Sequence, residues 1–134
     1  MITGNCECGD IRFEIDEPIF DFSHCHCSQC RRLHGAAYAS FAGVPKSALR
    51  YTSPLENLAC YASSPKNDRY FCRRCGSAIA VASKPEPDAL YVSMSAINGN
   101  PALPPGYHQY VGSIASWHKI TDDLPQYDVY PPED

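Results

Sequence analysis

The sequence contains no apolar stretch that approaches the ~20 residues of a membrane-spanning helix. Residues 1–6 also lack the basic start and the apolar run of a secretory signal peptide. We therefore expect no membrane partner. Eight cysteines without a secretory signal are more typical of metal-binding thiols than of a disulfide framework, which favours the reducing cytoplasm as the location.

Positive charge is also scarce. The chain has 11 Lys and Arg residues against 15 Asp and Glu residues, for a formal net charge of −4. Proteins that bind nucleic acid normally carry a basic face, so this balance disfavours a nucleic-acid partner. We expect no tight binding to duplex DNA at physiological salt.

Long helical patterns are missing as well. Twelve prolines and eight glycines divide the 134 residues into short segments, which favours short strands joined by turns over a helical bundle. One short helical turn is expected, capped by Ser28, running through Leu33 and ending at Gly35. The length predicts a single domain, residues 1–134, of mainly β class. Strands are expected at 11–15, 19–23, 37–41, 58–62, 77–81, 89–93 and 107–111.

What the sequence does have is cysteine, and the densest group is Cys25, Cys27 and Cys30. Side chains two positions apart in an extended chain point to the same face, so Cys25 and Cys27 can aim at one point while His26 faces away. A turn after Cys27 can bring Cys30 to the same place. Three converging thiolates favour a soft metal, of which Zn²⁺ is the commonest.

Two other pairs, Cys6/Cys8 and Cys72/Cys75, are each followed by glycine. A short gap between cysteines lets both sulfurs meet one metal, and glycine tolerates the tight turn that follows. Together the pairs supply the four thiolates of a closed structural zinc site. The alternative, a redox-active Cys72/Cys75 pair, would need a βαβ context that the sequence does not show.

The central trio has three ligands and lacks a fourth, which is the arrangement of a catalytic zinc with one open position. Two alternatives stay open. Cys60 or a nearby histidine could close the shell as a second structural site, or the trio could hold no metal. Cys60 lies in the apolar segment 58–62, where a buried, inert thiol is expected.

Two residues that follow the trio are candidates for binding substrate. Arg31 could hold a carboxylate, and His34 could serve as an acid, a base or a ligand. A solvated role is the alternative for Arg31 or its neighbour Arg32. We also expect the proline-rich loop 98–106 to help shape the mouth of the pocket.

Taken together these motifs resemble the glutathione-dependent formaldehyde-activating (GFA) family, which includes a centromere-associated protein. The similarity covers nearly the whole chain. It is carried by Gly4-x-Cys6-x-Cys8-Gly9, Cys25-His26-Cys27-x-x-Cys30-Arg31, residues 35–40, Arg69-x-Phe71-Cys72-x-x-Cys75-Gly76-Ser77, His108-x-x-Val111, Trp117 and Asp122-Asp123-Leu124-Pro125.

The resemblance implies a zinc-stabilised β-tent of small antiparallel sheets with up to two zinc ions. It implies structural zinc at Cys6, Cys8, Cys72 and Cys75, and a second, more labile zinc at Cys25, Cys27 and Cys30. The family's named reaction joins formaldehyde to glutathione, giving S-(hydroxymethyl)glutathione, and is formally a carbon–sulfur lyase reaction in reverse.

The function expected from sequence is therefore a zinc-dependent carbon–sulfur lyase acting on a small thiol, such as glutathione, and a small aldehyde. Two other classes remain as alternatives. One is a zinc-stabilised binding module without catalysis, and the other is a thiol redox or metal sensor. No residue in the sequence identifies glutathione as the substrate, and nothing in it indicates the oligomeric state.

Overall fold

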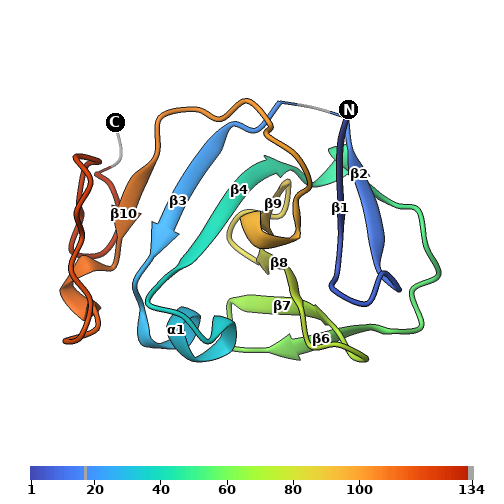
Figure 1. Cartoon of the computed structure of the whole chain (residues 1–134), viewed down its shortest axis with the longest axis horizontal. Coiled ribbons are helices and arrows are strands. Elements are labelled where there is room, and N and C mark those ends of the chain that lie inside the picture. Colours follow the sequence, from blue (N-terminus) through green and yellow to red (C-terminus); the bar gives the residue numbers. More distant parts are fainter. Residues whose placement is uncertain (17, 133–134) are drawn as a thin grey trace.

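The computed structural model of the chain describes residues 1–16 and 18–132. The last two residues of the domain expected at 1–134 lie outside that range. The fold is mainly β, as predicted, with one three-stranded and one seven-stranded sheet. The β1–β2 hairpin and the C-terminal segment lie at opposite ends of the long axis (Figure 1). Within the described ranges, no helix has the length and apolar character needed to cross a membrane.

The three-stranded sheet has the order β1-β2-β5, with antiparallel pairing throughout. Its central strand shows the alternation expected from sequence: Phe13 and Ile15 are buried, whereas Arg12 is exposed. The two outer strands are not predicted from sequence, because they are only three and four residues long and β1 contains glycine and asparagine. The strands are β1 (Ile2–Asn5), β2 (Arg12–Ile15) and β5 (Leu49–Tyr51).

The seven-stranded sheet has the order β10-β3-β4-β9-β8-β7-β6. Its pairs are antiparallel except for the edge pair β10–β3, which is parallel and sets His108 opposite His24. The antiparallel pairing expected from sequence therefore holds for every other pair of this sheet. The strands are β3 (Asp21–Cys25), β4 (Ala39–Pro45), β6 (Leu58–Ala62), β7 (Asn67–Cys72), β8 (Ala78–Ser83), β9 (Ala89–Ser93) and β10 (Tyr107–Gln109).

The main hydrophobic core lies between the two sheets. Ile11 and Phe13 from the small-sheet side pack in one cluster with Val44, Ile79 and Val92 from the large sheet. A second, smaller cluster forms around the central trio, where two cysteines pack with Ala39 and Phe41. The cysteines are thus part of the packing of the fold. Three short 3₁₀ helices, η1 (Lys46–Ala48), η2 (Met94–Ala96) and η3 (Val111–Ser113), complete the elements.

The single α-helix of the described chain, α1 (Ser28–His34), begins one residue earlier than its predicted cap implies. Its N-cap is Cys27, not Ser28, and the Cys27 sulfur accepts a hydrogen bond from the backbone N–H of Cys30 at 3.2 Å. Its C-cap is Gly35 with φ 59°, as predicted. The helix start therefore places two cysteines of the trio side by side.

One prediction about burial is wrong. Cys60 is exposed, because β6 is the edge strand of the large sheet and its last three residues face solvent. An apolar run in sequence does not distinguish a central strand from an edge strand, since that depends on which strands pair beside it.

Gly4→Ala should destabilise the fold by about 1–3 kcal/mol, the usual cost of overpacking a core. A Cβ at Gly4 would lie 2.1 Å from the Phe13 ring and 2.6 Å from the carbonyl oxygen of Ala96. Urea unfolding followed by circular dichroism at a fixed zinc concentration measures the effect. Thr3→Ala, on the exposed side of β1, is the control. Equal midpoints for Gly4→Ala and the wild type would contradict the packing of β1 on Phe13.

Candidate metal sites and the adjoining cavity

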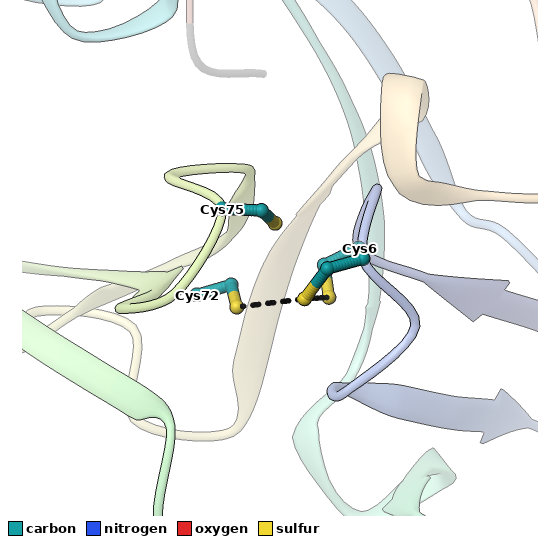
Figure 2. Close-up of side chains that lie close together, drawn as sticks. Cys6, Cys72 and Cys75 are labelled. Atoms are coloured by element: carbon teal, nitrogen blue, oxygen red, sulfur yellow. Dashed lines mark hydrogen bonds between the residues drawn. The ribbon is translucent and has the colours of Figure 1, made fainter.

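Four cysteines that are far apart in sequence meet between the two sheets. The sulfurs of Cys6, Cys8, Cys72 and Cys75 all lie within 4.8 Å of one another. Figure 2 shows Cys72, at the end of β7, and Cys75, in the turn that follows, extending toward Cys6. The sulfur of Cys8 lies 3.6 Å from that of Cys6 and 3.7 Å from that of Cys72. The structure therefore joins the N-terminal hairpin to the end of β7.

Two similar turns carry these cysteines. Gly9 and Gly76 follow the pairs and have φ values of 81° and 82°, in the left-handed region that favours glycine. In each turn the glycine N–H donates to the carbonyl of the first cysteine, at 3.1 Å for Cys6 and 2.8 Å for Cys72. Ser77 links the turns: the N–H of Glu7 donates to its hydroxyl at 3.0 Å. The same hydroxyl lies 3.2 Å from the sulfur of Cys75, and this hydrogen bond lowers the pKa of that thiol to about 5.

The central trio forms the second group, and its three sulfurs also lie within 4.8 Å of one another. Cys25 ends β3, Cys27 caps α1, and Cys30 lies in the first turn of that helix. Cys25 and Cys30 are buried, whereas Cys27 is half-buried. The three thiols interact: hydrogen bonds from Cys25 and Cys30 lower the pKa of Cys27 to about 2, and the same contact with Cys27 raises the pKa of Cys25.

Both groups fit a soft metal ion by the nature and spacing of their donors. Two thiolates bound to one Zn²⁺ at ~2.3 Å in tetrahedral geometry lie ~3.8 Å apart. The sulfur separations of 3.6 and 3.7 Å in the first group match this value. Within the described residues the trio has three members, because neither Cys60 nor a histidine joins it. The four-cysteine group thus offers a closed donor set, and the trio offers an open one.

His26 lies away from the trio's sulfurs, as its position between Cys25 and Cys27 predicts. It is fully buried, and its Nε2 lies 2.8 Å from Nδ1 of His108. Nε2 of His108 in turn lies 3.0 Å from the carboxylate of Asp122. Because a carboxylate only accepts, a neutral His108 donates from Nε2 to Asp122, and its Nδ1 accepts from His26. This series of hydrogen bonds connects the segment that carries the trio to β10 and the C-terminal region.

A cavity of about 250 Å³ adjoins the trio on the side of the large sheet. Tyr61, Arg69 and Val81 stand directly opposite one another on the adjacent strands β6, β7 and β8, and all three line it. Val81 also packs against the cluster that contains Cys25 and Cys30. At the other end the lining includes Gly76, next to the four-cysteine group. The cavity therefore extends from one cysteine group toward the other.

Arg69 joins the cavity to the trio. Its Nη2 donates to the sulfur of Cys30 at 3.4 Å and to Oε1 of Gln29 at 3.2 Å, and its Nε donates to the hydroxyl of Ser63 at 3.2 Å. Its Nη1 is buried and has no hydrogen-bond partner among the described residues. Ser93 also lines the cavity, and its hydroxyl is likewise buried without a hydrogen-bond partner among the described residues. Two residues of the cavity lining therefore each carry a buried polar group that has no hydrogen-bond partner among the described residues.

The two substrate-binding residues expected from sequence lie in different places. His34 lines the cavity, and burial lowers its pKa to about 4, so its imidazole is neutral at neutral pH. Arg31 is directed elsewhere: it donates to the carbonyl oxygens of His26 at 3.4 Å and Ser113 at 3.3 Å, and it is not among the cavity lining. Its role in binding substrate stays a prediction.

Sequence reasoning assigned no role to Arg69, His108 or Asp122, although all three fall within the motifs quoted for the family resemblance. The available signal was charge: Arg69 is a charged residue beside Tyr70, and Asp122 is the first of two adjacent aspartates. The contacts of Arg69 with Cys30 and of His108 with His26 join segments far apart in the sequence, so local patterns do not predict them. The loop 98–106, expected at the pocket mouth, is absent from the lining of this cavity, which β6, β7 and β8 build instead.

Three known proteins are similar to this chain. A protein of Halomonas elongata named "Putative glutathione-dependent formaldehyde-activating enzyme" is 31% identical over 128 residues, covering 90% of this chain and 81% of that protein. An uncharacterised lyase of Schizosaccharomyces pombe is 36% identical over 78 residues, which cover 57% of this chain and 53% of the relative. A crystal structure of a Rhodobacter sphaeroides protein superposes with a TM-score of 0.60 at 28% identity, covering 73% of this chain and 89% of that one.

The family described as glutathione-dependent formaldehyde-activating enzyme matches residues 1–113, which include both cysteine groups and Arg69. The match spans most of the chain, and the resemblance inferred from the cysteine motifs is confirmed. This chain belongs to the glutathione-dependent formaldehyde-activating family.

Proposed function

We propose that the chain is a zinc-dependent carbon–sulfur lyase-type enzyme that forms and breaks the adduct of a small thiol with a small aldehyde. The observation that carries the proposal is the open set of three converging thiols beside a cavity with unpartnered polar groups. Family membership and a relative named as a lyase support an enzymatic, formaldehyde-activating role.

Each cysteine group has its own part in the proposal. Cys6, Cys8, Cys72 and Cys75 hold a structural zinc that joins the N-terminal hairpin to β7. Cys25, Cys27 and Cys30 hold a second zinc with one position left for substrate. A zinc ion bound there would supply acidity, lowering the pKa of a thiol that completes its shell.

The residues around the trio would orient the substrate and exclude water. Val81 and the neighbouring apolar lining enclose the non-polar part of the thiol, and Arg69 and His34 offer polar contacts at neutral pH. In the proposed reaction a sulfur–carbon bond forms between the thiol and the carbonyl carbon, the carbonyl π bond breaks, and the thiol proton ends on the carbonyl oxygen. The reverse reaction returns that proton to sulfur.

Glutathione and formaldehyde are the substrates that the family description suggests. The cavity of about 250 Å³ is slightly below the ~300–1,000 Å³ typical of ligand pockets. It would therefore enclose the thiol end of a tripeptide and leave the remainder at the mouth. All eight cysteines are free thiols in the structure, which supports a reducing, cytoplasmic location.

The test combines zinc content with reaction rate. Protein prepared without chelator should contain between one and two zinc ions per chain, measured by elemental analysis. It should also accelerate the interconversion of thiol, formaldehyde and S-hydroxymethyl adduct, measured by exchange NMR at equilibrium because this reaction proceeds without a catalyst.

Two results would count against the proposal. Protein without zinc would remove its basis. Protein with two zinc ions but no acceleration over the uncatalysed exchange would favour the alternative of a binding module. In the expected case, selective loss of the labile zinc should return the exchange rate to background.

A further inference from the structure

We propose that Arg69 forms the carboxylate-binding part of the substrate site, and that the preferred thiol is a short mercapto acid with its carboxylate two or three carbons from sulfur. This inference rests on the proposed function for the identity of the site. It goes further by naming the residue that selects the substrate and the chemical class selected.

Arg69 has a guanidinium N–H donor that no described residue accepts. A guanidinium has five N–H donors in a fixed planar fork that matches a carboxylate. Three protein acceptors, Ser63, Gln29 and Cys30, engage Nε and Nη2, which leaves Nη1 buried without a partner. A buried donor without an acceptor is costly, and a ligand oxygen would remove that cost.

No other charged side chain competes with Arg69 among the described residues that line the cavity. Among the described residues that line the cavity, Arg69 is the one with a full charge at neutral pH; the others are apolar, aromatic or neutral polar. The buried hydroxyl of Ser93 can donate a further hydrogen bond. The cavity is thus polarised toward an anion of modest size with an apolar body.

The guanidinium of Arg69 also lies close to the sulfurs of the trio. Nη2 of Arg69 lies 3.4 Å from the sulfur of Cys30, and Nη1 is bonded to the same guanidinium carbon as Nη2. The free donor therefore lies a few ångströms from the point on which the trio converges. A ligand that places sulfur at that point and its carboxylate on Arg69 can have only a short spacer. The carboxylates of a longer peptide thiol would extend past this contact.

The experiment compares 3-mercaptopropionate with 3-mercapto-1-propanol, which has the same spacer and no charge. Binding to the zinc-loaded protein is measured by isothermal titration calorimetry, so that the result does not depend on turnover. Wild type should bind the acid at least about tenfold more tightly, as expected for a charge-assisted contact. Arg69→Gln should lose most of this preference while binding of the alcohol changes little.

Two further variants sharpen the comparison. Arg32→Gln removes an exposed charge from α1, the helix that carries Cys30, and is the control for overall electrostatics. Arg31→Gln tests the residue expected from sequence as the carboxylate partner. If Arg69→Gln fails to fold, Arg69→Lys replaces it: a lysine keeps the charge without the fork, and the preference should fall several-fold while Arg31→Gln retains it.

The outcomes separate this inference from the proposed function. A preference that disappears with Arg69 supports the site even if no catalysis is found. Equal binding of the acid and the alcohol by wild type would overturn the inference, as would a preference that persists in both Arg69 variants or is lost with Arg31. Any of these three results could coexist with acceleration of thiol–aldehyde exchange, so the proposed function would stand on its own test.

Discussion

Cys72→Ser is expected to leave the chain insoluble or without fixed tertiary packing. Cys72 is fully buried in the main core and contributes one of four converging sulfurs. The proposed zinc there links Cys8 to a residue 64 positions later. Structural zinc sites contribute on the order of 10–16 kcal/mol at neutral pH, which is comparable to the whole stability of a domain, about 5–15 kcal/mol.

Solubility, near-UV circular dichroism and zinc content measure this effect. Cys60→Ser is the matched control, because Cys60 is exposed and belongs to neither cysteine group. That variant should behave as the wild type. A Cys72→Ser protein that stays soluble, with native near-UV dichroism, would show that the four-cysteine group does not hold the fold together.

Cys27→Ser is expected to stay folded, to lose about one zinc equivalent and to return thiol–aldehyde exchange to the uncatalysed rate. The ligands of the trio all fall within residues 25–30, so a metal there closes no long loop and adds little to chain stability. Serine is also a preferred N-cap residue, so the start of α1 is preserved when Cys27 is replaced. The substitution therefore removes a ligand and keeps the helix.

Zinc analysis, circular dichroism and exchange NMR on this variant separate the two kinds of site. If Cys27→Ser unfolds as completely as Cys72→Ser, the trio is structural and a binding module becomes the better interpretation. Retention of full activity with one fewer zinc would place the chemistry elsewhere. The Cys60→Ser protein again serves as the control for removal of a thiol.

The trio and each of the two cysteine pairs were predictable from local geometry, whereas the meeting of the pair Cys6/Cys8 with the pair Cys72/Cys75 is a tertiary contact. Spacings of one or two residues bring sulfurs together whatever the rest of the chain does, and a glycine after each pair indicates the turn. The alternation at 11–15 was equally local, since one face of a strand is buried wherever the strand packs. These local features indicated the mainly β class and the family.

The surroundings of the trio were decided by tertiary structure. Arg69 on β7 contacts Cys30 on α1 although 39 residues separate them in the sequence, and no local pattern specifies this contact. The parallel pairing of β10 with β3 brings His108 to His26 in the same way. Cys60 is exposed because its strand lies at the edge of the sheet. Sequence spacing determined which neighbouring sulfurs can share a metal. The assembly of the sheets determined that the two distant cysteine pairs meet and what lies beside the trio, because contacts between distant segments depend on how the strands pack.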